Sequence, residues 1–372
     1  MTLSPQGPAT VIALIGNPNT GKSTLFNALT GLRQKTANYP GVTVEQHTGQ
    51  ITLDGQAVTL VDLPGAYSLA AQSPDEMVAI DVLLGHVTDL PRPRAVLAVV
   101  DATNLRRNLF LVTQLAELDL PLVVALNLSD VADSRGIRID SAELAKQLGA
   151  TFVPVSASRG TGLDALRRAL ASAIHAPAPT PLRVLPEVGD AAADLARRLR
   201  AAGSHLQDYE VERALIDAQG SAERRFEMTA GDAFRGELAA LRRRLGAGVS
   251  LAEAEATARY GLINAIVART EQRAPREVTF GDRLDRITNH PVIGSLLFLL
   301  VMAAVFQAVF SWATPLMNLI AGATAALGEG VRGLLPEGAL ASLIVDGVIA
   351  GVGGVIVFLP QILILFAFII FL

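Results

Sequence analysis

The sequence predicts an α/β domain with a mostly parallel six-stranded sheet, followed by an all-helical domain and then by transmembrane helices. Strand-length apolar runs alternate with amphipathic stretches from Thr10 to about Ile174, as in parallel sheets with helical crossovers. The chain then becomes almost wholly helical in composition, and its last part holds two long uncharged apolar runs. We place these three parts at residues 1–176, 177–275 and 276–372.

The first part is expected to contain six strands. They are Val11–Ile15, Gln50–Leu53, Ala57–Asp62, Ala95–Asp101, Leu122–Asn127 and Phe152–Val155. The second and third meet at Asp54-Gly55, a strong signal for a tight hairpin, so this pair should be antiparallel. Asp140, followed three residues later by Glu143, predicts the start of a helix.

The second part begins with the proline-rich segment Pro177–Pro186, which favours a linker. From Gly189 to Arg273 the sequence is rich in alanine, leucine, arginine and glutamate and predicts a set of helices. Ser250 and Glu253 have the spacing of a capping box, which places a helix start there.

The third part contains two membrane-span candidates. Val292–Phe310 has 19 residues and Val348–Leu372 has 25, and neither contains a charged side chain; both are long enough to cross a hydrocarbon core. In the second run we expect a turn at Gly351–Gly354. Gln361, after Pro360, then either lines a cavity between broken helices or makes a helix–helix hydrogen bond.

The charges that flank these runs predict their orientation. Basic residues precede the first run, and the segment between the runs, taken as a loop, is acidic overall. The first group is Arg283, Arg286 and His290, and the second is Arg332 with Glu329, Glu337 and Asp346. Since cytoplasmic flanks are rich in lysine and arginine, the N-terminal part should lie in the cytoplasm. The second run is still apolar at Leu372, so we expect further membrane segments beyond it.

The overall composition excludes several classes of protein. The net charge is −4 and the isoelectric point is about 5.8, so no basic field favours nucleic acid, and we expect no nucleic-acid partner. The chain has no cysteine, which excludes disulfides and thiolate metal sites. Its five histidines lack the spacing of metal ligands, and we assign them no metal.

A glycine-rich loop follows the first strand. The segment Gly16–Ser23 matches G-x-x-x-x-G-K-[ST] and precedes a helix, the context in which this motif cradles phosphates. Lys22 would meet the outer phosphates, and the Ser23 hydroxyl would ligate Mg²⁺. The candidate phosphate-binding residues are Gly16, Asn17, Pro18, Asn19, Thr20, Gly21, Lys22, Ser23 and Thr24.

Two further segments have the order expected of switch elements. The third strand ends in a D-x-x-G motif, in which the carboxylate would reach Mg²⁺ and the glycine amide would face the terminal phosphate. A threonine lies between this motif and the P-loop helix and would complete the Mg²⁺ ligands Ser23, Thr43 and Asp62. The residues concerned are Asp62, Leu63, Pro64 and Gly65, and Gly41, Val42, Thr43, Val44 and Glu45.

The ends of the last two strands predict the base. Asn127-Leu128-Ser129-Asp130 stands where GTP-binding proteins carry N-K-x-D, and Ser156-Ala157-Ser158 follows as the loop that would bond the base oxygen. A carboxylate at position 130 can accept from both guanine N1–H and the 2-amino group. Adenine would leave that buried carboxylate unpaired, at a large cost. These motifs predict a GTPase.

Two residues depart from the usual pattern. Leu128 replaces the lysine of N-K-x-D, so we expect modest affinity and fast nucleotide exchange. Ala66 follows the D-x-x-G motif where many GTPases carry a water-positioning glutamine. Hydrolysis then needs another group, and Asn17 is the candidate, either as a ligand of a K⁺ ion or as a loop residue bonded to backbone. The candidate catalytic residues are Asn17, Lys22, Thr43 and Gly65.

The set of motifs is similar to that of the ferrous iron transport protein B family. GNPNTGKSTLFNALTG, YPGVTVE, DLPG, NLSD and SAS resemble its G domain, and ARYGLINAIVART resembles the end of its helical spacer. GDRLDRITNHPVIGSLLFLLVMAAVFQ and GVGGVIVFLPQILILF resemble the start of its membrane domain. The resemblance covers nearly the whole chain.

The resemblance implies GTP-dependent uptake of Fe²⁺ through a multi-pass protein of the bacterial inner membrane. The cofactors expected from the motifs are GTP or GDP, Mg²⁺ and K⁺. The partners implied are the lipid bilayer, small cytosolic accessory proteins of iron uptake and other copies of the chain. The alternative is a membrane-tethered regulatory GTPase of the ribosome-assembly or tRNA-modification type. The acidic isoelectric point and the broken second apolar run favour the transporter.

Overall fold

The computed structural model describes residues 10–31, 34–39, 44–70, 74–88, 90–274, 280–336 and 338–371. It divides into two compact units, Met1–Arg276 and Glu277–Leu372. The boundaries expected at residues 176/177 and 275/276 stay predictions.

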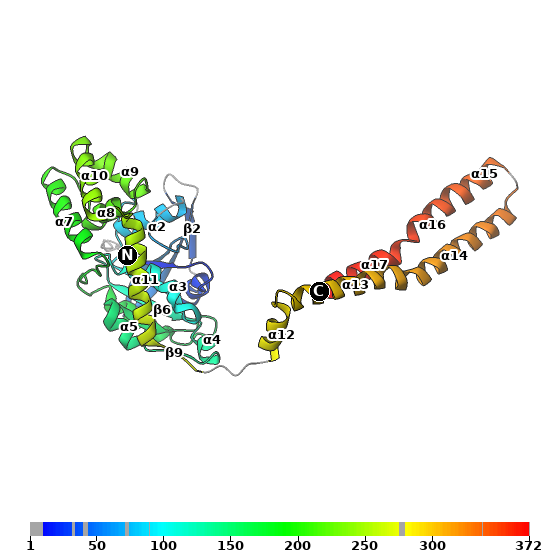
Figure 1. Ribbon diagram of the computed structural model, residues 1–372, viewed down its shortest axis with the longest axis horizontal. Helices are drawn as coiled ribbons and strands as arrows, with labels where there is room; N and C mark the ends of the chain where they lie inside the picture. The colour runs from blue at the N-terminus through cyan, green and yellow to red at the C-terminus, as the bar shows by residue number, and fades with distance from the viewer. Residues whose placement is uncertain are drawn as a thin grey trace, which may run out of the picture. The chain divides into compact units, whose positions relative to one another are not determined.

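A seven-stranded sheet forms the centre of the first unit, in the order β2-β3-β4-β1-β5-β6-β8 (Figure 1). The strands are β1 Val11–Gly16, β2 Gln34–Asn38, β3 Glu45–Leu53, β4 Gln56–Asp62, β5 Ala95–Asp101, β6 Leu122–Asn127 and β8 Thr151–Pro154. Only β2–β3 and β3–β4 pair antiparallel among these strands. The expected hairpin at Asp54-Gly55 is confirmed, with φ values of 46° and 82°. The expected count of six strands was wrong, because the polar edge strand β2 adds a seventh.

Side chains that alternate along the buried strands create a core on each face of the sheet. In β1, Ile12 and Leu14 join the core that contains Leu25 of α1, whereas Val11 and Ile15 join the core that contains Leu109 of α3. The helices of this part are α1 Lys22–Thr30, α2 Pro74–Leu84, α3 Leu105–Leu115, α4 Ser129–Ser134, α5 Ser141–Leu148 and α6 Leu163–Ala173. A strand buried on both faces reads as a continuous apolar run, which is why these strands could be predicted.

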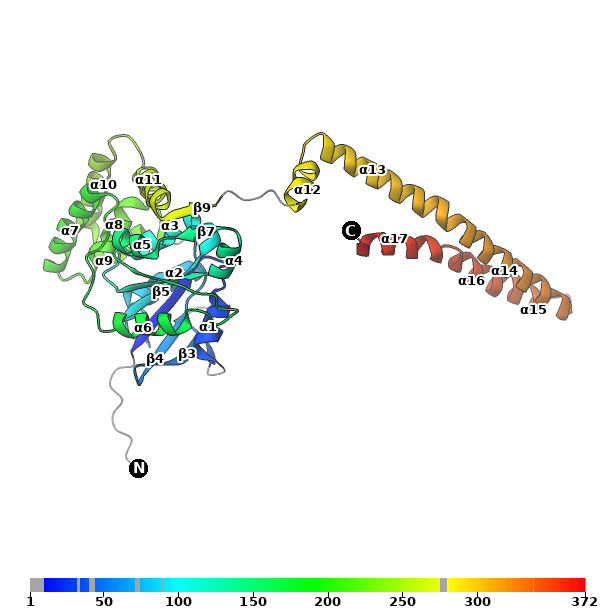
Figure 2. The same ribbon diagram turned by 90° about the horizontal axis from the view of Figure 1, so that it is seen from below.

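Five helices follow the linker and pack around their own apolar core. They are α7 Pro186–Ala201, α8 Asp208–Ile216, α9 Ser221–Ala230, α10 Asp232–Gly246 and α11 Leu251–Thr270 (Figure 2). The helix start at Asp140 is confirmed, since its carboxylate accepts from the amides of Ala142 and Glu143. Ser250 does precede α11, but its side chain makes no capping hydrogen bond. The reciprocal capping box lies instead at Gln207 and Glu210.

The last of these helices ties the helical part to the sheet domain. α11 packs against α3 and α5, and β9 Glu271–Arg273 continues it as a strand that pairs with β7 Ile137–Ile139. Arg259 of α11 is 1% exposed. Its guanidinium bonds Glu117, after α3, at 2.6 Å and the Thr113 hydroxyl at 3.1 Å, so a buried ionic contact adds to the apolar packing.

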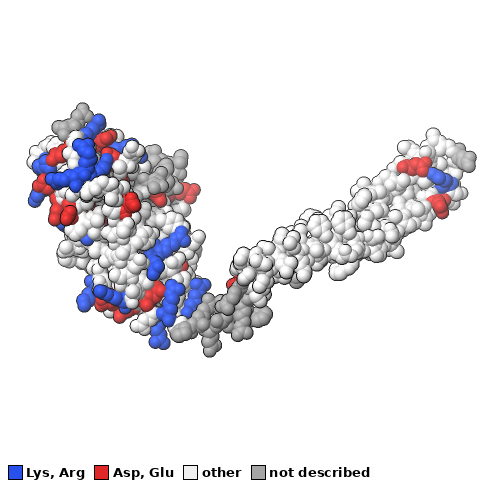
Figure 3. Space-filling model, viewed as in Figure 1, with Lys and Arg blue, Asp and Glu red and all other residues white. Residues whose placement is uncertain are grey.

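The second unit consists of helices. α12 Phe280–Thr288 precedes two stretches, Ile293–Leu334 and Ala339–Ile370, that are long and apolar enough to cross a membrane by length and composition. They pack against each other, and the surface of the pair in Figure 3 is uncharged along most of its length. They comprise α13 Ile293–Gln307, a π-helix Ala308–Trp312, α14 Ala313–Leu334, α15 Ala339–Ser342, a π-helix Leu343–Ile349, α16 Ala350–Ile356 and α17 Leu359–Phe371.

Two expectations for this unit were wrong. Arg332 and Asp346, expected in a long loop, lie within the helices and pair with each other at 2.6 Å. Gly351–Gly354, expected as a turn, lies within α16. Gly353 leaves no room for a side chain, because an added Cβ would lie 2.1 Å from Thr324 Cγ2. Gly353 therefore allows close helix packing within a continuous helix rather than a chain reversal.

Candidate nucleotide-binding site

The P-loop joins β1 to α1 and adopts the shape that its glycines allow. Asn19 and Gly21 have positive φ angles of 65° and 80°. A side chain at Gly21 would collide with the rest of the site, because an added Cβ would lie 2.3 Å from Nδ2 of Asn127. A loop that enters a helix in this way presents backbone amides at the positive end of the helix dipole, which suits phosphate.

Asn127 holds three loops together. Its Nδ2 donates to the backbone oxygen of Thr20 at 2.9 Å, and its Oδ1 accepts from the backbone amide of Ala157 at 3.0 Å. The side chain of Asn127 is buried. The sequence predicted Asn127 as part of a base-recognition motif, whereas the structure gives it this clamping contact, which fixes the P-loop, the base motif and the Ser156–Ser158 loop relative to one another.

A cation and a carboxylate meet at the phosphate end of the site. Lys22 of α1 forms an ion pair with Asp62, the last residue of β4. The D-x-x-G segment reaches the P-loop, since the Ala66 amide donates to the Gly16 oxygen at 3.2 Å. Ser23 is exposed at the start of α1. Serine hydroxyl and aspartate oxygens are ligands that Mg²⁺ favours, so Ser23 and Asp62 fit this ion.

The remaining predicted switch residues are only partly described. Thr43, Gly41 and Val42 lie outside the described residues, and their predicted roles stay predictions. Glu45 begins β3, and Val44 directly precedes it, with its backbone oxygen accepting from the Tyr39 amide at 3.0 Å. Leu63 and Pro64 follow β4, and Leu63 is buried.

Asn17 is a buried polar residue inside the P-loop. It is 3% exposed, and its backbone oxygen accepts from the Thr20 hydroxyl at 2.8 Å. Its Nδ2 atom is buried and has no hydrogen-bond partner in the described part of the chain. An unpaired buried amide is costly unless a ligand completes it, so this end of the loop fits a bound polar group.

The base end of the site is built around Asp130 at the start of α4. One carboxylate oxygen, Oδ2, lies 2.9 Å from Nε of Arg159. The other, Oδ1, is buried and has no partner among the described residues. The nearby Ser156 hydroxyl and then the Arg159 guanidinium lower the pKa of Asp130, so the carboxylate is ionised at neutral pH. An ionised carboxylate with a free acceptor fits the two donors of guanine.

Sequence reasoning missed Arg159. It follows the predicted Ser156–Ser158 loop by one position, and no motif marks it. Leu128 has a φ of 60°, a left-handed conformation that is uncommon for leucine. The described residues contain no group of three or more histidine, cysteine, aspartate or glutamate side chains placed to hold a metal ion.

Comparison with known proteins shows which proteins this chain resembles. The sequence model of ferrous iron transport protein B matches residues 10–170. A fusion of Fe(2+) transport protein A and the Fe(2+) transporter FeoB from Porphyromonas gingivalis is 35% identical over 384 residues, covering 99% of this chain and 44% of its own. The Fe(2+) transporter FeoB of Leptospira interrogans is 34% identical over 368 residues, covering 96% of this chain and 51% of its own.

The chain belongs to the ferrous iron transport protein B family. It spans about half the length of the curated relatives that it matches. Solved FeoB structures also match. The cytosolic domain from L. pneumophila is 33% identical with a TM-score of 0.55, covering 71% of this chain and all of its own. A GDP-bound S. thermophilus G-domain variant is 34% identical with a TM-score of 0.60 over the same shares. The predicted G-domain fold is thus confirmed.

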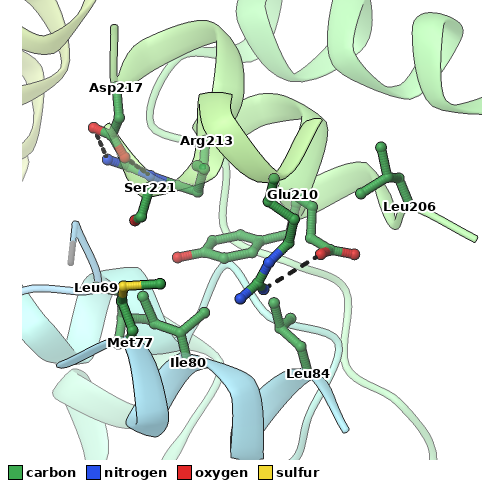
Figure 4. A pocket seen from close by; sticks show the side chains of 12 residues that line it. Leu69, Met77, Ile80, Leu84, Leu206, Glu210, Arg213, Asp217 and Ser221 are labelled. Carbon is green, nitrogen blue, oxygen red and sulfur yellow. Dashed lines mark hydrogen bonds and ion pairs between the residues drawn. The ribbon is translucent and has the colours of Figure 1, made fainter. Parts of the chain in front are cut away.

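The helix that follows the D-x-x-G motif contacts the helical part of the chain. Met77, Ile80 and Leu84 of α2 face Glu210 and Arg213 of α8 across a small cavity of about 30 Å³ (Figure 4). Arg225 of α9 also pairs with Asp81 of α2. Apolar and ionic contacts therefore connect the helix that follows the D-x-x-G segment with the helices of the extension.

Proposed function

We propose that this chain binds and hydrolyses GTP and belongs to a transporter that moves Fe²⁺ across a bacterial inner membrane. The observation that carries the proposed nucleotide specificity is the Asp130 carboxylate, which has one buried oxygen without a partner among the described residues. Guanine offers two donors to such a group and adenine offers none in that position, so the expected discrimination is large. The GDP-bound FeoB G domain supports this assignment.

Each end of the nucleotide has a candidate partner in the site. The P-loop amides and Lys22 would bind the phosphates, and Ser23, Thr43 and Asp62 would hold Mg²⁺, which supplies positive charge at the outer phosphates. For these contacts to form, Lys22 must give up Asp62 as its partner. Gly65 would donate its amide to the terminal phosphate, and Asn17 would hold a K⁺ ion in place of a water-positioning glutamine.

A competition titration tests the nucleotide claim. The chain, purified in detergent, is titrated with a fluorescent GDP that is displaced by GTP or by ATP. We expect GTP to displace it at concentrations at least a hundred-fold lower than ATP. Lys22→Ala should weaken the binding of both GTP and GDP without unfolding the protein, since Lys22 supplies positive charge at the phosphates. Equal potency of ATP and GTP would show that the base assignment is wrong.

The iron and membrane claims rest on the relatives. Those compared are named Fe(2+) transporters, and two apolar stretches of this chain are long enough to span a bilayer. Two helices cannot enclose a polar path for a cation, so transport would need the full-length protein. The relative that is fused to Fe(2+) transport protein A supports an accessory partner. Self-association remains a partner hypothesis.

The contact between α2 and the helical part supports a route from the nucleotide site to the helical part. α2 comes after the D-x-x-G segment in the sequence. If GTP reorders that segment, α2 should shift with it, and its contacts with α8 and α9 should change. A ligand shifts such an equilibrium only by binding the two states differently. The helical part would sense the difference between the GTP-bound and GDP-bound states through Asp81, Arg225 and the apolar residues of α2.

A further inference from the structure

The loop after β8 presents Arg159 at a fixed place. Ser156 and Thr161 exchange backbone hydrogen bonds of 3.0 and 3.2 Å, which closes a short loop. Gly162 allows this closure, because its φ is 80° and an added Cβ would lie 2.3 Å from the Pro154 oxygen. The Arg159 amide also donates to the Ser156 oxygen at 3.2 Å. The backbone of the arginine is thus held beside the base end of the site.

From this position the side chain of Arg159 reaches the carboxylate that would read the base. Its Nε lies 2.9 Å from Oδ2 of Asp130. The Asp130 side chain is 17% exposed, whereas that of Arg159 is 70% exposed. The arginine therefore approaches from the solvent side and leaves the buried oxygen Oδ1 free.

We propose that Arg159 is a nucleotide-release residue that competes with the guanine base for Asp130. The inference rests on the proposed role of Asp130 in base recognition. Guanine needs both carboxylate oxygens, one for N1–H and one for the 2-amino group, and Arg159 already donates to one of them. Its positive charge also offsets the negative charge that strengthens hydrogen bonds to a carboxylate.

Because Arg159 is exposed, it and the guanine base can readily replace each other as the partner of Asp130. A solvent-exposed ion pair contributes only about 0.2–1 kcal/mol, because water screens it and both side chains lose freedom. The base can therefore displace the arginine when nucleotide binds, and the arginine can recapture Oδ2 when the base loosens. Leu128 cannot offer the charged cover that lysine gives at its position, so the base depends more on its contact with Asp130.

The expected effect is modest but measurable. Without Arg159 the base would have no competitor for Oδ2, so bound GDP should leave more slowly. The upper part of the range for such ion pairs, about 0.4–1 kcal/mol, corresponds to a change of about two- to five-fold in the release rate. The affinity for GDP should rise by a similar factor.

Stopped-flow release of methylanthraniloyl-GDP from the full chain tests the proposal. Arg159→Gln should slow release two- to five-fold, and Arg159→Lys, which keeps the charge, should fall between the variant and the parent. The matched control is Arg168→Gln, because Arg168 is exposed on α6 and should leave the rate unchanged. A release rate that is unchanged or faster in Arg159→Gln would overturn the proposal.

A second variant separates this inference from the proposed function. In an Asp130→Asn background, loaded with xanthosine diphosphate, the ion pair is absent and Arg159→Gln should change release by much less. If the parent does not prefer guanine over adenine nucleotides, the role of Asp130 fails and this inference fails with it. If the preference holds but Arg159→Gln has no effect, only the role of Arg159 is wrong.

Discussion

The side-chain amide of Asn127 donates to the backbone oxygen of Thr20 at 2.9 Å, joining the end of β6 to the P-loop across 107 positions of sequence. Oδ1 of the same side chain accepts from the Ala157 amide at 3.0 Å. A single buried residue therefore sets the distance between the phosphate end and the base end of the site.

Asn127→Ala should weaken nucleotide binding and lower the free energy of unfolding. The substitution leaves the Thr20 oxygen and the Ala157 amide without this partner, at a cost of about 1–3 kcal/mol. We expect GDP affinity to fall at least ten-fold, measured by displacement of a fluorescent nucleotide. Asn127→Asp keeps the acceptor for Ala157 but loses the donor to Thr20, so its GDP affinity should lie between that of the parent and that of Asn127→Ala. An alanine variant with parental affinity would show that the clamp is not needed.

Potassium should accelerate GTP hydrolysis more than sodium does. Ala66 cannot position water, so we expect a K⁺ ion held by the side-chain oxygen of the buried Asn17 to supply charge stabilisation near the phosphates. The measurement is GTP turnover in matched KCl and NaCl, with Asn17→Ala and Asn17→Asp alongside. Equal rates in the two salts, or an alanine variant that keeps the potassium response, would contradict the role of Asn17.

Loss of the Arg225–Asp81 ion pair should uncouple the helical part from the nucleotide. We expect hydrogen exchange in α8 and α9 to differ between the GDP state and the state with a non-hydrolysable GTP analogue. Arg225→Ala should reduce that difference while nucleotide affinity stays close to that of the parent. Arg224→Ala is the control, because Arg224 bonds the Gln219 oxygen on its own side of the helical part. A full difference in Arg225→Ala would exclude this contact as a relay.

The buried network around Glu117 predicts a pH dependence of stability. Burial raises the pKa of Glu117 to about 7 and outweighs the attraction to Arg259. Four carboxyl groups surround only two deeply buried guanidinium groups. They are Glu117, Glu212, Asp217 and Glu255, with Arg213 and Arg259. Because carboxyl groups outnumber guanidinium groups here, a proton on one of the carboxyl groups reduces the excess negative charge of the network.

The sign follows from which state holds the proton more tightly. Between the ordinary pKa of about 4.5 and the folded value of about 7, the folded protein binds more protons at Glu117 than the unfolded chain does. Stability therefore falls as the pH rises through this window, by on the order of 2–3 kcal/mol from this group. Denaturant unfolding at several pH values gives the free energy of unfolding as a function of pH. This dependence should be flatter in Glu117→Gln than in the parent, and it should be the same as in the parent for Glu253→Gln, whose side chain is exposed. A profile for Glu117→Gln that is as steep as the parental one would contradict the shifted pKa.

The sequence predicted the buried strands and the nucleotide motifs because both have strong local signals. β5 and β6 are continuous apolar runs, and the P-loop glycines are required by its backbone. β2 was missed because an edge strand gains little burial and its sequence, QKTAN, has no apolar alternation. The contact of Arg159 with Asp130 could not be predicted, since it depends on where two loops meet in space. The close packing of Gly353 against Thr324 likewise depends on how two helices meet in space.

If guanine recognition at Asp130 controls iron transport, uptake by the full-length protein should depend on which nucleotide is supplied. The full-length protein is placed in proteoliposomes, and uptake of radiolabelled Fe²⁺ is measured with GTP or xanthosine triphosphate on the G-domain side. Asparagine at position 130 offers a donor to the 2-oxo group of xanthine, which matches it better than the 2-amino group of guanine. The parent should respond to GTP, and Asp130→Asn should respond to xanthosine triphosphate instead. Uptake that is the same with either nucleotide in both proteins would contradict the account.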